Sequence, residues 1–186
     1  GAEFLPMASP DFEMGPPSID AIELARVVDR GIREGHAMDV HGLVIESGKK
    51  VWNVIVDICT INSAGGLQDA SALAAVAALE DARLPGLDTS SNDYVIDYKT
   101  KTDKKLPLAN QPITVTVFKL GDQLFVDPTD AEGKLYDARL SATVLANGKL
   151  CALQKGGEGT ANVDEINAMV ELAVKKSEEL RKALKA

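Results

Sequence analysis

Three long segments of the chain have the apolar spacing or the composition of a helix. We predict helices over residues 19–34, 68–82 and 162–186. Ser18 is a suitable N-cap for the first helix, and Gly35 is a suitable C-cap. Asn162 would cap the last helix, with Glu165 placed to complete a capping box. The middle helix holds seven alanines and is almost wholly apolar, which predicts that it is buried on all sides.

Shorter segments with alternating or β-branched residues predict strands. They lie at residues 44–46, 51–61, 93–98, 113–120, 124–126, 138–145 and 150–155. In 51–61, the residues predicted to share one face are Trp52, Val54, Val56, Ile58 and Thr60. Turn residues predict hairpins between the later strands, and the polar stretch 99–105 also reads as a hairpin. These antiparallel hairpins favour an α+β (mixed α/β) fold over a doubly wound parallel sheet.

The predicted elements fall into two blocks separated by a break at Pro85-Gly86. Each block ends in a helix, so we divide the chain into residues 5–89 and 90–186. Residues 1–4 are interpreted as a remnant of cloning and are left out of the fold prediction.

Composition and charge narrow the class of protein. The chain has 186 residues, 45% of them apolar, but no run of 18 apolar residues, so we expect no membrane span. Cys59 and Cys151 are too few for a disulfide framework and fit a reducing compartment, which predicts a cytoplasmic location. The 28 acidic and 20 basic residues give a net charge of −8. This balance argues against a general nucleic-acid binder.

Three of the six arginines lie on one side of the first predicted helix. Arg26, Arg30 and Arg33 fall within about 60° of one another on a helical wheel, and the opposite side is apolar. Because the planar guanidinium group binds phosphate oxygens well, this stripe is a candidate site for the phosphate backbone of a nucleic acid. The alternative is a solvated face whose arginines form ion pairs with neighbouring acidic residues.

The chain resembles the RNase PH family at four places that follow one another in the family's order. The matching segments read FEMGPP and AIELARVVDR (12–17 and 21–30), GGLQDASALAAVAAL (65–79), KLPL (105–108) and FVDP (125–128). The resemblance extends over residues 5–186. Within the family the chain is most similar to the non-catalytic ring subunit of archaeal exosomes.

This resemblance implies a fold of two βαβ-like halves, each a mixed sheet packed on helices. Relatives carry further strands ahead of residue 5, so we expect an N-terminal truncation and an incomplete first half. The resemblance also implies a hexameric ring, a trimer of heterodimers with a catalytic RNase PH-type paralogue, bearing RNA-binding cap subunits. Such a ring degrades single-stranded RNA from the 3′ end, with inorganic phosphate as the attacking nucleophile.

The phosphate site of the family falls on residues that do not suit it. Active members place Thr or Ser and then Arg after a Gly-Gly pair at a helix N-terminus, where the N–H groups also bind the anion. Here these two positions are Leu67 and Gln68, and the adjacent Asp69 would repel phosphate. We therefore regard Leu67 and Gln68 as a degenerate phosphate site.

The acidic pair of active members is also incomplete. Asp127 matches its first position, the second falls on Gly133, and Asp137 is a poorly placed substitute. His36 and His41 have no cysteine or carboxylate at ligand spacing. We therefore predict no catalytic residues, no metal and no cofactor.

Together these residues predict a non-catalytic, RNA-contacting ring subunit. We assign RNA-phosphate contacts to Arg26 and Arg30 first, and then to Arg33. Two alternatives stay open: a phosphate-dependent 3′→5′ exoribonuclease active in its own right, and a scaffold whose arginines pair only with a partner's acidic residues. The lysines of 99–105 are either solvated or a further RNA contact.

Overall fold

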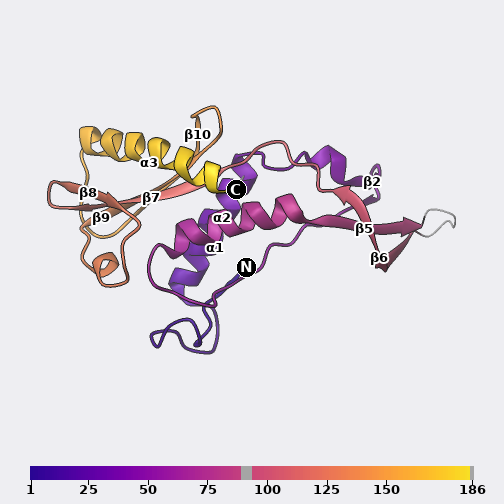
Figure 1. Ribbon diagram of the computed structural model, residues 1–186, viewed down its shortest axis with the longest axis horizontal. Coiled ribbons are helices and arrows are strands. Elements are labelled where there is room, and N and C mark those ends of the chain that lie inside the picture. The colour runs from indigo at the N-terminus through magenta and orange to yellow at the C-terminus, as the bar shows by residue number, and fades with distance from the viewer. Residues whose placement is uncertain (89–93, 185–186) are drawn as a thin grey trace.

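Residues 1–88 and 94–184, which this computed structural model describes, form three long helices and several short sheets (Figure 1). The helices are α1 (Ile19–Glu34), α2 (Leu67–Asp81) and α3 (Val163–Ala183). The strands are β1 (Ala2–Glu3), β2 (Val44–Glu46), β3 (Lys50–Val51), β4 (Ile58–Cys59), β5 (Arg83–Asp88), β6 (Val95–Lys105), β7 (Ile113–Leu120), β8 (Gln123–Val126), β9 (Ala138–Val144) and β10 (Leu150–Gly156). The predicted mixed α/β fold class is confirmed.

The helix ends confirm the predicted caps. The hydroxyl of Ser18 accepts a hydrogen bond from the backbone N–H of Ala21 at 3.2 Å, and Gly35 ends α1. At the start of α3, the side chain of Asn162 accepts from the N–H of Glu165, whose carboxylate accepts from the N–H of Asn162. Each cap satisfies N–H groups that have no partner inside the helix.

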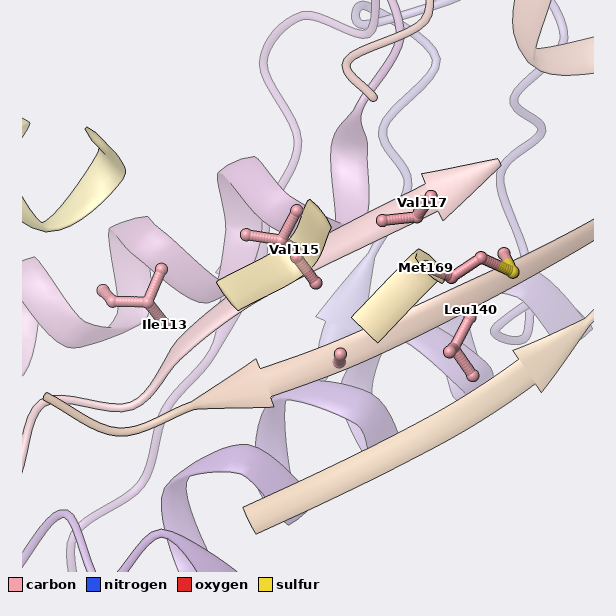
Figure 2. Packing of buried hydrophobic residues seen from close by; sticks show 7 residues of the cluster. Ile113, Val115, Val117, Leu140 and Met169 are labelled. Atoms are coloured by element: carbon pink, nitrogen blue, oxygen red, sulfur yellow. The ribbon is translucent and has the colours of Figure 1, made fainter. Parts of the chain in front are cut away.

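The C-terminal half is built on an antiparallel sheet with strand order β10-β9-β7-β8. Helix α3 packs on one face of this sheet, as Figure 1 shows, and the sequence alternates accordingly. Figure 2 shows the side chains of β7 and β9 that meet Met169 of α3. The core they form comprises Ile113, Val115, Val117, Leu140, Ala142, Met169 and Ala173.

The opposite face of the same sheet carries buried hydroxyl groups and meets α1 and α2. Thr114 Oγ1 lies 2.9 Å from Thr143 Oγ1, and Thr116 Oγ1 lies 2.8 Å from Ser141 Oγ. All four residues are at most 3% exposed. Gly31 lets α1 approach this face closely, because a Cβ atom there would lie 3.2 Å from Thr143 Cγ2.

Helix α2 is exposed along one side, so the prediction that it is buried all round is wrong. Val76 and Leu79 are buried, whereas Ala70, Ala74 and Ala77 are exposed. Residues 72–79 of this helix hold only alanine, leucine and valine, so no polar side chain there indicates which side faces solvent. The tertiary packing decides it: α1 and β7 cover one side of α2, and the other side is left exposed.

Residues 51–61 do not form the continuous strand that their alternation predicts. Only β3 and β4, at the two ends of the segment, are paired as strands. The alternating face itself is correct, since Trp52, Val54 and Val56 point towards a buried cluster and Thr60 is buried. A strand also needs a hydrogen-bonding neighbour, and in the described residues no sheet of this half has more than two strands. Between α1 and residues 54–58 lies a groove of about 460 Å³.

Residues 1–4, which the fold prediction left out, contribute to the N-terminal half. Ala2 is buried and pairs in parallel with Ile58, and the ring of Phe4 stacks on Phe12 at 4.7 Å. Ala2 is buried because β1 pairs with β4 and lies against the core shared by α1 and α2.

The segment predicted as a strand at 93–98 and a hairpin at 99–105 is one long strand, β6, within the described residues. It pairs antiparallel with β5, which runs through the predicted break at Pro85-Gly86. Figure 1 shows this pair projecting from the body of the molecule at the right. The expected division at 89/90 and residue 93 lie outside the described residues.

Candidate functional site

The predicted amphipathic character of α1 is confirmed. Leu24 and Val28 are buried in a core shared with α2, while Arg26 and Arg33 are exposed and Arg30 is half-buried. The three arginine side chains therefore lie on the side of α1 away from that core.

The three guanidinium groups have different surroundings. Arg26 forms no hydrogen bond or ion pair with any residue in the described ranges. Arg33 lies 3.3 Å from Asp29 Oδ2 and 3.2 Å from Glu34 Oε1, so neighbouring carboxylates compensate its charge. Arg30 instead donates hydrogen bonds to β10 in the C-terminal half. The alternative, in which the arginines form ion pairs with neighbouring acidic residues, thus holds for Arg33 but not for Arg26 or Arg30.

A hollow of about 240 Å³ lies where the N-terminus of α2 meets the C-terminal sheet. Leu67 and Gln68, the positions of the degenerate phosphate site, line it together with Asp69. The Leu67 side chain is apolar, and Gln68 Oε1 accepts from Ser141 Oγ at 2.9 Å. The first turn of α2 is therefore bonded into the sheet.

Arg139, on β9, joins three elements at the base of this hollow. Its Nη2 lies 2.6 Å from Glu23 Oε2 of α1, and its Nη1 donates to Gln68 Oε1 of α2 at 2.9 Å. Its Nε donates to Tyr136 Oη at 3.3 Å. The Arg139 side chain is only 13% exposed, so this ion pair is largely shielded from water.

The carboxyl group of Asp69, in the wall of the hollow, has a raised pKa. Burial raises its pKa to about 6. Hydrogen bonds from the N–H and the hydroxyl of Thr116 act in the opposite direction and lower the pKa. The negative charge of Asp127 adds a smaller rise. Three oxygen–oxygen contacts run in series from Asp69 through Thr116 and Ser141 to Gln68. The two hydroxyl groups supply only two hydrogens for these three contacts. When Asp69 is protonated, its hydrogen can supply the third contact; when it is ionised, the Thr116 hydroxyl donates to it and one contact of the series lacks a hydrogen.

Of the positions considered for the acidic pair of active family members, only Asp127 and Asp137 carry a carboxylate. Asp127 is exposed, with a φ of 52°, and lies beside Gly66 at the start of α2. Gly133 lines the hollow but offers no side chain. The carboxylate of Asp137 accepts a hydrogen bond from the N–H of Gly121 at 2.8 Å, so it caps a turn elsewhere.

Sequence reasoning missed the contributions of Glu23, Arg139 and Gln154 to this region. Arg139 and Gln154 lie at polar positions of strands, and the sequence does not show whether such a position faces solvent or another element. Contacts between residues more than a hundred positions apart depend on the tertiary fold, and no local signal reports them.

Residues 1–88 and 94–184 show neither a candidate metal centre nor a candidate membrane span. These residues contain no cluster of three or more His, Cys, Asp or Glu side chains that could hold a metal ion. Nor does any helix there have both the length and the apolar character needed to cross a membrane.

Comparison with protein families gives two matches in order along the chain. Domain 1 of the 3′ exoribonuclease family (RNase PH) matches residues 2–85. Domain 2 of the same family matches residues 110–176. The projecting strand β6 lies between the two matched regions.

Curated relatives and solved structures agree with these matches. Exosome complex component Rrp42 of Methanocella arvoryzae is 41% identical over 182 residues, covering 98% of this chain and 66% of the relative. Its counterpart from Methanopyrus kandleri is 40% identical over 185 residues, covering 100% and 68%. A chain of the Archaeoglobus fulgidus exosome with RNA bound to the active site superposes with a TM-score of 0.84 at 38% identity, covering 98% and 68%. The chain thus spans about two thirds of the length of the curated relatives it matches.

Proposed function

Because the chain belongs to the 3′ exoribonuclease (RNase PH) family, we propose that it is a non-catalytic, RNA-contacting subunit of an exosome ring. The ring is a trimer of heterodimers with a catalytic RNase PH-type paralogue, bears RNA-binding cap subunits and acts in the cytoplasm. It degrades single-stranded RNA in the 3′→5′ direction by phosphorolysis. This chain helps to hold the RNA near the active site of the paralogue.

The observation that carries the RNA-contacting role is the arrangement of α1. Arg26 and Arg30 lie on its exposed side, without carboxylate partners among the described residues, in a chain whose net charge is −8. An uncompensated pair of guanidinium groups attracts phosphates locally even where the overall charge is negative. Such contacts orient RNA without reading its sequence.

The hollow at the N-terminus of α2 supports the non-catalytic role. Leu67 replaces a hydroxyl donor, and Gln68 is neutral and bonded to the sheet. The Arg139 guanidinium is already paired with Glu23, and Asp69 adds a further carboxylate to the wall. A phosphate ion would meet more acidic than free basic groups there, which disfavours binding.

The alternative, a phosphate-dependent exoribonuclease active by itself, predicts a simple product. The purified chain, given RNA and inorganic phosphate, would release nucleoside diphosphates. We expect no release from the chain alone and phosphate-dependent release from the chain mixed with its catalytic paralogue.

The RNA-contacting role is tested by Arg26→Glu/Arg30→Glu in the assembled complex. We expect the affinity for poly(A) RNA to fall at least about tenfold, and the slope of log K against log salt to become shallower by about 1.4, because two phosphate contacts are lost. The matched control is Lys175→Glu/Lys182→Glu on α3, which changes the net charge equally at two exposed positions. Unchanged RNA affinity in the arginine variant, with assembly intact, would exclude this role.

A further inference from the structure

Gln154 of β10 makes a direct contact with one of the two uncompensated arginines. Arg30 Nη1 donates to Gln154 Oε1 at 3.0 Å and to the carbonyl oxygen of Leu153 at 3.3 Å. The Gln154 side chain is itself anchored, because its Nε2 donates to the carbonyl oxygen of Lys155 at 3.3 Å. β10 is an edge strand of the sheet, and α1 packs against it.

These two contacts leave one edge of the Arg30 guanidinium without a hydrogen-bond partner among the described residues. Its Nη1 carries two N–H groups, and the two acceptors on β10 use both. The Nε and Nη2 groups have no partner among the described residues. Together they form the two-donor edge of the guanidinium that matches two oxygens of a phosphate.

We propose that Gln154 is a positioning residue that holds the Arg30 guanidinium with its Nε–Nη2 edge directed outward to receive an RNA phosphate. This inference rests on the proposed function. A free arginine side chain loses rotamer freedom when it binds, and a side chain that is already held loses less. Gln154 is neutral, so it orients Arg30 without cancelling its charge.

The two neighbouring arginines show what this arrangement adds. Arg33 is held, but by carboxylates that cancel its charge. Arg26 keeps its charge, but no described residue holds it. Of the three arginines, only Arg30 has a side chain held by described residues and a charge that no described carboxylate compensates. A phosphate site requires both properties, and the contact with Gln154 provides the first without removing the second.

The test is a double-mutant cycle in the complex assembled with the catalytic paralogue, measured as affinity for poly(A) RNA. Gln154→Met keeps the length of the side chain and removes the acceptor; we expect affinity to fall about 3–10-fold, the cost of holding one long side chain. Arg30→Ala should lower affinity further. Gln154→Met added to Arg30→Ala should have no additional effect, because Gln154 acts only through Arg30.

The controls separate positioning from a structural role. Gln123→Met, at an exposed position of the opposite edge strand β8, should leave RNA affinity unchanged. Two outcomes would overturn the positioning role alone. One is an additive loss of affinity in the Gln154→Met/Arg30→Ala variant. The other is a normal affinity for Gln154→Met while Arg30→Ala weakens binding. If Arg30→Ala and Arg26→Glu/Arg30→Glu both leave RNA affinity unchanged, the proposed function itself fails.

Discussion

The two faces of the strands β7 and β9 are built from alternate residues of the same segments, yet they are stabilised in different ways. On one face, Val115 and Val117 pack with Met169 of α3 (Figure 2). On the other, Thr114 and Thr116 form hydrogen bonds with hydroxyl groups of β9 and with the side chains of α2. Both faces are buried, so burial alone does not account for the difference.

The two faces of this sheet pack against different parts of the chain. The apolar face lies within the C-terminal half, where α3 needs only shape and volume to pack well. The hydroxyl face receives α1 and α2 from the N-terminal half, and hydrogen bonds have preferred distances and directions. The bonds of Thr116 and Ser141 hold α2 against the sheet. Helix α1 and its arginines are held by the Glu23–Arg139 ion pair and by the hydrogen bonds from Arg30 to β10.

The largest effect is expected on the apolar face. Met169 is 1% exposed, so Met169→Ala leaves a cavity and should lower the free energy of unfolding by about 2–5 kcal/mol. Urea denaturation followed by circular dichroism measures this loss. Val163→Ala, at a 73% exposed position of the same helix, serves as the control and should change stability by less than about 0.5 kcal/mol. Equal losses in the two variants would show that α3 does not provide the core.

On the hydroxyl face, Asp69 should make stability depend on pH. Its folded pKa of about 6 lies above the unfolded value of about 3.9, so its contribution is fully present below about pH 4 and is lost as the pH rises through 6. Asp69→Asn supplies the missing hydrogen at every pH. Relative to wild type, this variant should gain about 2–3 kcal/mol between pH 4 and pH 7.5, measured by urea denaturation at each pH. Parallel pH profiles for the two proteins would contradict the raised pKa.

The smallest effect concerns the hydroxyl pair itself. Thr143→Val leaves the buried hydroxyl of Thr114 without its partner and should cost about 1–2 kcal/mol of stability. Thr114→Val/Thr143→Val removes both hydroxyls and should cost clearly less than the sum of the two single variants. Thermal denaturation of all four proteins completes the cycle. Strict additivity would mean that the two hydroxyls do not interact.

Much of the fold could be predicted because local patterns carry it. The caps Ser18 and Asn162, and the alternation of β7 and β9, lie within a few residues of the elements they define. The RNase PH family resemblance was likewise carried by short segments, and the family matches confirm it. Two failures concern strand pairing: residues 52–57 alternate like a strand but have no strand neighbour in the described structure, and β6 pairs with β5 across a Pro-Gly break. A third is the exposed side of α2, which its apolar composition hid.

The candidate site was predictable only in part. Helical spacing placed Arg26, Arg30 and Arg33 on one side of α1, as the structure shows. Pairing with neighbouring acidic residues was one of the two alternatives, but spacing could not tell that it would apply to Arg33 and not to Arg26 or Arg30. Nor could it tell that Gln154 holds Arg30. Their roles in RNA contact stay predictions.

The sequence by itself determined the helices with their caps, the alternating faces of the strands and the family, because these depend on neighbours along the chain. Only the tertiary structure decided which polar groups meet. The Glu23–Arg139 ion pair, the Asp69–Thr116 hydrogen bonds and the Gln154–Arg30 contact each join residues at least 47 positions apart. Such contacts arise when the hydroxyl face of the C-terminal sheet receives α1 and α2, and their geometry is set by packing rather than by any local sequence preference.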